Sequence, residues 1–372
     1  MRLWFRRWSV AGMGVAVVIL VAACGNDAPP PDFGPYSTVP GDNDFDRTPS
    51  RGRGIFAESL RLADHIVFPT DIDSELTTAR GGGVSADDRG LHETALSPRQ
   101  RAIAVSFGVV GSFGLAAANR ADSAAGPQKY LAVSLTAFRD ERTAAAAATE
   151  MARLDTEARP ENPSLGSVKA WKNVVIRVYV ELPVPDPGQL AAIIATTYRK
   201  QEDQLAGFDT AAVPDPATVP LDPDGLLTRL VRTGDPIADP KTFAAFGIRA
   251  YAALSPEPAR KLTAFSGNGV TALAVSHNKF LYRMRDSKAA TSYADWLSED
   301  PENSEYTWMR NARDLPGARC SAAARPDPKS VQARRFRCVV TRGEYVAVVY
   351  SNTETDIRQL AAAQYAIMAG AR

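Results

Sequence analysis

The sequence predicts an α+β protein with two tandem related domains, each built from an antiparallel or mixed sheet packed with helices. Three observations lead to this prediction. The chain has 372 residues, which is more than one ordinary core accommodates. A pattern of strands and helices recurs at an offset of 170 residues, and a segment rich in Pro and Asp separates the two copies. Hydrophobic residues make up 45% of the chain and charged residues 23%, as is typical of globular proteins.

The clearest recurrence is a hairpin that occurs once in each half, at residues 168–180 and 338–350. Both segments are rich in β-branched and aromatic residues, as strands usually are. A two-residue turn divides each of them, at Lys172–Asn173 in the first copy and at Arg342–Gly343 in the second. Asn and Gly readily adopt the positive φ that such turns require. The sequence therefore predicts equivalent hairpins in two related domains.

A helix rich in alanine follows each hairpin at the same offset. Asp186 and Asp356 precede the shared run Gln-Leu-Ala-Ala, and an Asp at this place is a natural N-cap. A strand and a further helix precede each hairpin, namely residues 130–138 and 143–154 in the first half and residues 270–282 and 288–297 in the second. Each half thus reads strand, helix, hairpin, helix, and we expect two helices to cover one face of the sheet. Chance similarity between two generic βα patterns is the alternative.

The beginning of the chain is typical of an exported lipoprotein. Residues 1–23 contain a basic start, an apolar run over residues 10–21 and small residues at the end, which is the order found in signal peptides. The basic residues are Arg2, Arg6 and Arg7. Cys24 follows Val-Ala-Ala as in a bacterial lipobox, so we expect cleavage before Cys24 and a diacylglycerol on its thiol. An ordinary signal peptide or an uncleaved anchor helix is the alternative, although the apolar run is shorter than the about 20 residues of a spanning helix.

This prediction places the protein at the extracytoplasmic face of the cell membrane, with the membrane as a partner through the N-terminal lipid. Residues 24–53 are rich in Pro, Gly, Asp and Ser and bury too little apolar surface to fold alone. They are therefore predicted to be a disordered tether. Asp42, Asp44 and Asp46 alternate within it, but the glycine of a calcium loop is missing, so we take them as solvated charges.

The folded part is predicted to divide at a Pro-rich boundary over residues 255–258. Residues 54–254 form the N-terminal α+β domain, which includes a connector rich in Pro and Asp, and residues 259–372 form the C-terminal α+β domain. Residues 243–254 are apolar and are expected to pack onto the first domain. Residues 81–83 are three glycines that follow no convincing strand, so they predict a flexible turn rather than a phosphate loop.

Charge and cysteine content restrict the partners. The net charge is +1, and residues 1–23 carry three Arg and no acid, so the remainder has 40 basic and 42 acidic residues and a charge of −2. The sequence lacks the basic stripe of nucleic-acid-binding proteins, and we expect no nucleic acid as a partner. With Cys24 lipidated, Cys320 and Cys338 remain. An even pair in an exported chain is most simply a disulfide, and two reduced buried thiols are the alternative.

No motif predicts a catalytic, cofactor-binding or metal site. The histidines are His65, His92 and His277, and no Gly-x-Ser-x-Gly elbow accompanies them. Ser276 and Lys279 match Ser-x-x-Lys, but they lie in a predicted strand and the companion motifs of penicillin-binding enzymes are missing. No His or further Cys lies near Cys320 and Cys338 at the spacing of a zinc site.

Four features occur together in this chain: the lipobox at Cys24, the run Glu58–Asp73, Phe138–Asp140 before an alanine-rich helix, and Cys320 with Cys338 before Gln364-Tyr365-Ala366. With these features the chain resembles a family of uncharacterised two-domain lipoproteins from the cell envelope of mycolate-bearing actinobacteria. The resemblance covers nearly the whole mature chain. It implies an envelope lipoprotein but no reaction and no catalytic residues, because the family has no assigned activity.

Two functions remain open at this point. The first, which we favour, is a non-catalytic envelope lipoprotein whose two domains bind an unknown envelope ligand or protein, without a cofactor. The second is a hydrolase or transferase that acts on envelope glycans or lipids through acids such as Asp71 and Asp73. Carboxylates that converge in a cleft, or a His with a Ser, would favour the enzyme. An apolar groove would favour the binding protein.

Overall fold

The computed structural model describes most of the chain. The described residues are 31–85, 91, 95–120, 127–155, 163–210, 215–299, 306–309, 315, 317–325 and 334–370. The predicted signal peptide, Cys24 and His92 lie outside these residues. Within the described ranges, no helix is both long and apolar enough to cross a membrane.

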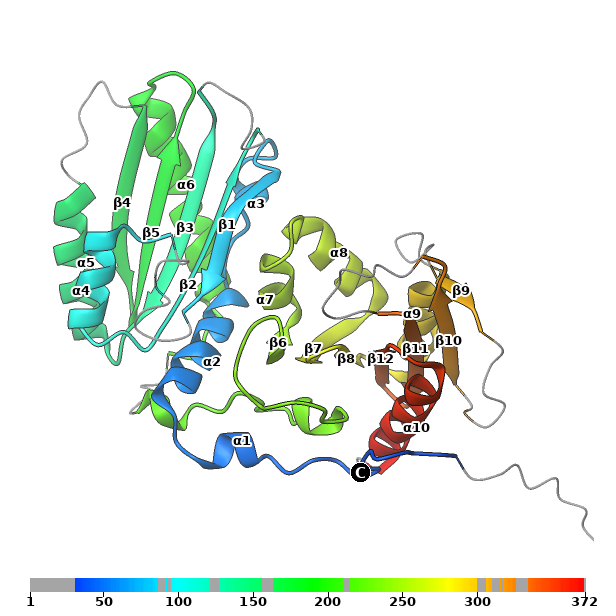
Figure 1. Cartoon of the computed structure of the whole chain (residues 1–372). Coiled ribbons are helices and arrows are strands. Elements are labelled where there is room, and N and C mark those ends of the chain that lie inside the picture. Colours follow the sequence, from blue (N-terminus) through cyan, green and yellow to red (C-terminus); the bar gives the residue numbers. More distant parts are fainter. Residues whose placement is uncertain are drawn as a thin grey trace, which may run out of the picture. The chain divides into compact units, whose positions relative to one another are not determined.

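The first sheet has five strands in the order β1-β2-β3-β5-β4, and each neighbouring pair is antiparallel. Its strands are β1 (Thr78–Val84), β2 (Gly111–Ala118), β3 (Tyr130–Ala137), β4 (Ser164–Trp171) and β5 (Val174–Glu181). The accompanying helices are α2 (Arg51–Ala63), α3 (Pro69–Ile72), α4 (Pro98–Ser106), α5 (Glu141–Asp155) and α6 (Pro187–Leu205). Figure 1 shows this sheet with helices packed along it.

Successive residues of β5 point to opposite faces of the first sheet, as in any strand. Val175 packs with Ala144 of α5, whereas Ile176 belongs to the main core together with Leu190 of α6. The sheet is therefore covered on both faces, by α4 and α5 on one side and by α2 and α6 on the other (Figure 1). The expectation that both helices of a unit cover one face is wrong. Burial on two faces explains why β5 reads as a nearly continuous apolar run.

The second sheet has seven strands in the order β6-β7-β8-β12-β11-β10-β9, again antiparallel throughout. Its strands are β6 (Phe243–Gly247), β7 (Val270–Ser276), β8 (Lys279–Met284), β9 (Tyr306–Trp308), β10 (Ala318–Ala323), β11 (Phe336–Arg342) and β12 (Tyr345–Ser351). The helices are α7 (Ile248–Ala253), α8 (Pro258–Asn268), α9 (Ser287–Glu299) and α10 (Glu354–Gly370). The connector before β6 holds two 3-10 turns, η2 (Pro216–Thr218) and η3 (Leu227–Arg229).

Helices cover both faces of the second sheet as well. The Arg337 guanidinium donates to the carbonyl of Leu297 in α9, at 3.0 Å, while the next residue, Cys338, lies 4.0 Å from the carbonyl of Ile357 in α10. Consecutive residues of β11 thus face different helices.

The two sheets share one topology, which confirms the predicted pair of related domains. The order β1-β2-β3-β5-β4 matches β6-β7-β8-β12-β11, and β10 and β9 extend the second sheet. In each unit a helix follows the central strand, a hairpin comes next, and a second helix closes the unit, with α5 and α6 corresponding to α9 and α10. The fold class is therefore α+β with two tandem domains.

The two copies differ by one residue at the hairpin turn. Lys172–Asn173 form the first turn as predicted, and Lys172 has a φ of 49°. The second turn is Gly343–Glu344, since Arg342 still pairs with Tyr345, and Gly343 has a φ of 56°. The sequence places this turn one residue too early because the alignment forces a constant offset.

Of the two predicted N-cap residues, Asp186 is an N-cap in the structure and Asp356 is not. Asp186 caps α6 and accepts a 2.9 Å hydrogen bond from the backbone N–H of Gln189. Asp356 lies inside the first turn of α10, which begins at Glu354, and the Thr353 hydroxyl accepts from the Asp356 N–H at 3.3 Å. The carboxylate of Asp356 is thereby left to other partners, described below.

Two strand regions escape the sequence-based prediction. The three glycines lie inside β1, where Gly81 and Gly82 have φ values of 117° and 156° that side chains rarely tolerate. A Cβ on Gly82 would come within 2.7 Å of the Gly114 carbonyl oxygen of β2. The predicted strand 270–282 is a hairpin, β7 and β8, that turns at His277–Asn278, and His277 has a φ of 56°.

Residues 243–254 divide between the two halves of the chain. Strand β6 pairs with β7 and so extends the second sheet, although these residues precede the predicted boundary. Helix α7 lies against the end of α2, where the Arg249 guanidinium donates to the Ile66 carbonyl and the Ala250 N–H donates to Asp64, both at 2.8 Å.

Residues 31–50, the second part of the predicted tether, contact the rest of the chain and are called the N-terminal strap here. Figure 1 shows the strap, in dark blue, passing the end of α10 before it reaches α2. The Asp32 carboxylate accepts from the Gln359 amide at 2.7 Å, and the Gly41 N–H donates to the Thr228 carbonyl at 2.8 Å. A short helix, α1 (Asp44–Arg47), lies in its middle. Apolar contacts add to these polar bonds, because Phe33, Tyr36 and Phe45 pack against the core, and the Phe45 ring lies edge-on to Phe243 at 5.1 Å.

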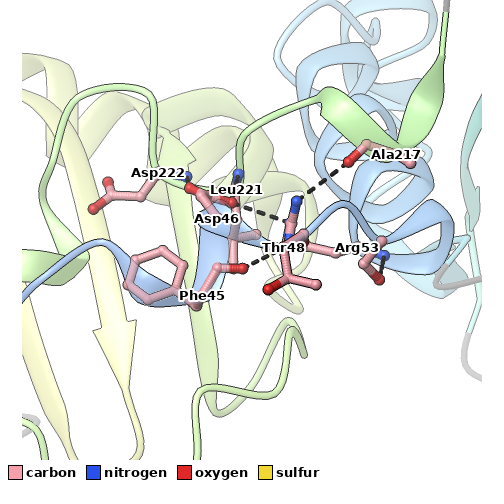
Figure 2. A network of polar contacts seen from close by, with 8 residues as sticks. Phe45, Asp46, Thr48, Arg53, Ala217, Leu221 and Asp222 are labelled. Atoms are coloured by element: carbon pink, nitrogen blue, oxygen red, sulfur yellow. Dashed lines mark hydrogen bonds and ion pairs between the residues drawn. The ribbon is translucent and has the colours of Figure 1, made fainter.

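The network at the end of the strap is shown in Figure 2. Oδ1 of Asp46 lies 3.1 Å from Nε of Arg53, and the two side chains are only 7% and 9% exposed. Asp46 also accepts from the backbone N–H groups of Leu221 and Asp222, at 2.8 and 3.1 Å. Arg53 donates to the carbonyls of its own segment and to that of Ala217. Asp46 is therefore a buried structural residue and not the solvated charge that the sequence predicts.

Candidate functional site

Cys24, the predicted lipidation site, lies outside the described residues. The other two cysteines are joined by a disulfide. Cys320 and Cys338 lie directly opposite each other on β10 and β11 and are 2% and 0% exposed. The bond thus fastens the extension strand β10 to the part of the sheet that both domains share.

The acids of the enzyme alternative have structural partners. Asp71 caps α3 by accepting from the Phe68 N–H at 3.0 Å, and it lies 3.8 Å from the Arg249 guanidinium. Asp73 forms a 2.7 Å ion pair with Lys129. Burial acts to raise the pKa of Asp73, but hydrogen bonds from Lys129 and from the Glu75 N–H outweigh it and lower the pKa. A low pKa favours the ionised form, which does not suit a general acid.

The described histidines occupy structural positions. Nδ1 of His65 lies 2.8 Å from the carbonyl of Gln204, and its ring packs edge-on against Phe208 at 5.3 Å. His277 forms the β7–β8 turn, and burial lowers its pKa, so the ring is neutral near pH 7. In the described part of the chain, no hydrogen bond joins a His to a Ser and then to an acid as a triad requires.

Ser276 and Lys279 flank the β7–β8 turn and not a helix start, so the Ser-x-x-Lys match is accidental. Lys279 is nevertheless unusual because its side chain is fully buried. Burial lowers its pKa to about 8. Its Nζ donates to the Thr233 hydroxyl and, at 3.2 Å, to Oδ1 of Asn278.

Four acids with a raised pKa were not identified from the sequence. Glu58 and Asp222 are buried, whereas Asp64 and Asp155 are partly buried. Burial is the main cause of the raised pKa in each case. Each has partners that explain it. Glu58 pairs with Arg61 at 2.5 Å, and Asp222 accepts the backbone N–H groups at the start of η3. These contacts are local, whereas Asp64 accepts from the Ala250 N–H and Asp155 from the Gln100 amide, which lie on distant segments. Among the described residues, no group of three or more His, Cys, Asp or Glu could hold a metal ion.

Two large cavities lie against the second sheet and its neighbours. The first, the α2 cavity, has a volume of about 650 Å³ and is lined by α2, the connector, β6 and β7. Its charged groups are mostly paired. Arg283 lies 3.0 Å from Asp224, and Arg61 is bound to Glu58.

The second, which we call the basic cavity, has a volume of about 660 Å³. Its walls come from β1, from the turn that precedes β6, from α7, α8 and the segment between them, and from β7 and β8. The lining includes Tyr251, Phe280, Lys241 and Lys261, and no acidic residue is among it. Its size falls in the range of small-molecule sites, about 300–1,000 Å³.

Comparisons with known proteins identify the family of the chain. Residues 45–163 and 156–221 match the N-terminal domain of unknown function DUF7373, and residues 226–371 match its C-terminal domain. No curated protein sequence matches the chain. One solved structure, the extracellular domain of PknH from Mycobacterium tuberculosis, has 14% identity and a TM-score of 0.26. It covers 39% of this chain and 96% of its own, and so slight a likeness carries no argument. The two family matches span both domains, and the chain therefore belongs to the DUF7373 family, whose function is unknown.

Proposed function

We propose that the protein is a lipid-anchored binding protein at the extracytoplasmic face of the cell membrane and that its ligand occupies the basic cavity. The location is supported by the basic start, apolar run and small residues before Cys24. The Cys320–Cys338 disulfide agrees with export, because disulfides persist in oxidising compartments.

One contrast supports binding over catalysis. The candidate acids Asp71 and Asp73 are engaged in a helix cap and an ion pair, while the aromatic and cationic groups of the basic cavity face an open volume. Catalysis requires a nucleophile or a general base held within hydrogen-bond reach of its partner. Binding requires only a shaped cavity with a few polar groups, which is what the described residues provide. The hydrolase or transferase alternative has no comparable support.

Mass spectrometry of the full chain purified from membranes tests the anchor. We expect the mature protein to begin at Cys24 with a diacylglycerol on that residue, and Cys24→Ser to abolish the lipid. A mature chain that begins elsewhere, or that carries an unmodified Cys24, would remove the anchor from the proposal.

Co-purification tests the binding half separately. Small molecules are extracted from the wild-type protein and from Tyr251→Ala/Phe280→Ala, which empties the aromatic wall of the basic cavity. Thr271→Ala, in the lining of the α2 cavity, is the matched control. We expect a compound that is lost from the double variant only. Equal retention in all three proteins would show that the basic cavity is not the binding site.

A further inference from the structure

We infer that the basic cavity binds a small anionic amphiphile, a molecule with a phosphate or carboxylate group joined to an apolar body. This inference deepens the proposed binding function and rests on it. The observations that carry it are the charges around the cavity, its aromatic wall, the edge of β1 and a second, apolar cavity nearby.

Two cations line the cavity, and a third lies against its aromatic wall. Lys241 and Lys261 line it, and Arg334 lies over the ring of Phe280, with its guanidinium carbon 5.8 Å from the ring centre. Across the described residues, no carboxylate lies within ion-pair distance of these three side chains. Most other basic side chains near the cavities are paired, as Arg260 is with Glu257 at 2.8 Å. Cations grouped around a cavity without counter-charges attract an anion.

Among the described residues, the acids that are near in sequence form no ion pair with Lys241 or Lys261. Oδ1 of Asp239 accepts from the backbone N–H groups of Lys241 and Thr242, at 2.8 and 3.0 Å, and so stabilises a turn. Glu257 is held by Arg260. The positive charge of Lys241 and Lys261 is therefore available to a ligand.

Aromatic rings form the wall beside these cations. Tyr251 and Phe280 line the cavity, and Tyr350 packs edge-on against Phe280 with ring centres 6.4 Å apart. Arg334 lies 4.6 Å from the ring centre of Tyr350. The hydroxyl of half-buried Tyr251 forms no hydrogen bond within the described part of the chain, so it can donate to an anion. The wall thus offers apolar area and one polar group.

Strand β1 adds backbone groups to the lining of the basic cavity. Among the described strands β1 pairs with β2 alone, at the edge of its sheet, and Gly82, Gly83 and Val84 line the cavity. Every second backbone group of an edge strand points away from its neighbour and can bond a ligand. The glycines leave this edge uncovered by side chains.

An apolar cavity of about 180 Å³ borders the same segment, residues 255–261, as the basic cavity. Glu257 to Arg260 border this apolar cavity, while Ser255, Pro256 and Lys261 border the basic one. Phe68, Leu76 and Leu115 are among its lining. A cationic, aromatic cavity next to an apolar one matches a ligand with a charged head and a hydrocarbon body, rather than a free ion.

Calorimetric titration of the full chain in phosphatidylcholine nanodiscs tests the inference, with empty nanodiscs as the blank. Three probes are compared: dihexanoylphosphatidylglycerol, the uncharged dihexanoylglycerol, which lacks the phosphate, and glycerol 3-phosphate, which lacks the acyl chains. The variants are Lys241→Gln/Lys261→Gln, the charge-preserving Lys241→Arg/Lys261→Arg, and the control Lys288→Gln on the exposed side of α9.

We expect the anionic lipid to bind about tenfold or more tightly than the uncharged lipid, because a hydrogen bond to a charged group contributes more than about 1.4 kcal/mol. The glutamine pair should lose at least this factor, while the arginine pair and Lys288→Gln keep it. Equal affinity for both lipids, or an unchanged affinity of the glutamine pair, would show that the cavity does not select an anion. The proposed binding function would be unaffected by that result. If glycerol 3-phosphate bound as tightly as the anionic lipid, the apolar body would contribute nothing, and the ligand would not be an amphiphile. Failure of all three probes would overturn the inference, and the co-purification experiment decides the binding function independently.

Discussion

The hydroxyl of Tyr36 donates a 2.5 Å hydrogen bond to Oδ1 of Asp356, which lies 320 positions further along the chain. This bond fastens the N-terminal strap to the first turn of α10. The Ser351 hydroxyl donates to the other carboxylate oxygen of Asp356, so this one side chain ties the strap and the end of β12 to α10.

We predict that Tyr36→Phe lowers the free energy of unfolding by about 1 kcal/mol, the usual contribution of such a hydrogen bond. Urea denaturation measures it, and Ser37→Ala, an exposed neighbour in the strap, is the control. Burial, followed by the hydrogen bond to Asp356, raises the pKa of Tyr36 to about 12. Because the folded pKa lies above the unfolded value of 10, the hydrogen bond contributes its full stability below pH 10. This contribution is lost as the pH rises through 12. The difference in the free energy of unfolding between wild type and Tyr36→Phe should thus vanish between pH 10 and 12. A difference that stays constant over this range would contradict the prediction.

We predict that Asp46→Asn destabilises the protein far more than Asp42→Asn. Asp46 is buried against Arg53 and accepts two backbone hydrogen bonds, and breaking a buried pair costs about 3–5 kcal/mol. Asp42 also pairs with an arginine, Arg47 at 3.4 Å, but its side chain is 87% exposed, and exposed pairs contribute about 0–1 kcal/mol. Chemical denaturation of both variants provides the test. Equal effects would show that the network in Figure 2 does not stabilise the strap.

Asp42 and Asp46 also show which structural features the sequence predicts and which it does not. Both belong to the same alternating pattern, yet one side chain is buried and the other exposed. Two partners of Asp46, the backbone N–H groups of Leu221 and Asp222, come from more than 170 positions away, which no local pattern reveals. The duplicated hairpins could be predicted since strands buried on both faces are apolar and β-branched throughout. Strand β1 could not be, because its glycines have no side chains to show a pattern.

The candidate site could not be predicted from the sequence for a similar reason. Lys241, Lys261 and Arg334 lie on three different segments, and neither their spacing nor their neighbours bring them together. Only the pairing of β6, β7, β8 and β12 places Phe280 and Tyr350 beside them. The disulfide is the one site feature that counting predicts, since two cysteines remain after Cys24 is assigned to the lipid.

We predict that Cys320→Ser/Cys338→Ser lowers the free energy of unfolding by about 3 kcal/mol, the chain-entropy value for a loop of this size. The two residues are 18 positions apart and join β10 to β11. Denaturation with and without a reducing agent measures the effect, because reduction should affect the wild type only. A wild type that responds to the reductant no more than the double variant would show that the bond contributes nothing to stability.

We predict that Lys279→Met stabilises the protein at neutral pH and that this gain falls as the pH rises. The folded pKa of Lys279 is about 8 because the side chain is buried, against 10.5 in the unfolded chain. Above pH 10.5 the lysine is neutral in both states, and its burial carries no charge penalty. As the pH falls through 8 the buried side chain becomes charged, so below pH 8 the wild type is destabilised by the full cost of that charge. The shift corresponds to about 3 kcal/mol.

Thermal unfolding of both proteins between pH 6 and 10.5 measures the gain from Lys279→Met. Thr233, the partner of Nζ, is exposed and can bond water once the lysine is removed, so the variant should retain its fold. Lys288→Met, on an exposed part of α9, should give a difference from wild type that does not change over the same range. If the difference for Lys279→Met were equally flat, Lys279 would be charged in the folded protein at every pH tested, and its ammonium group would have a counter-charge or solvent contact.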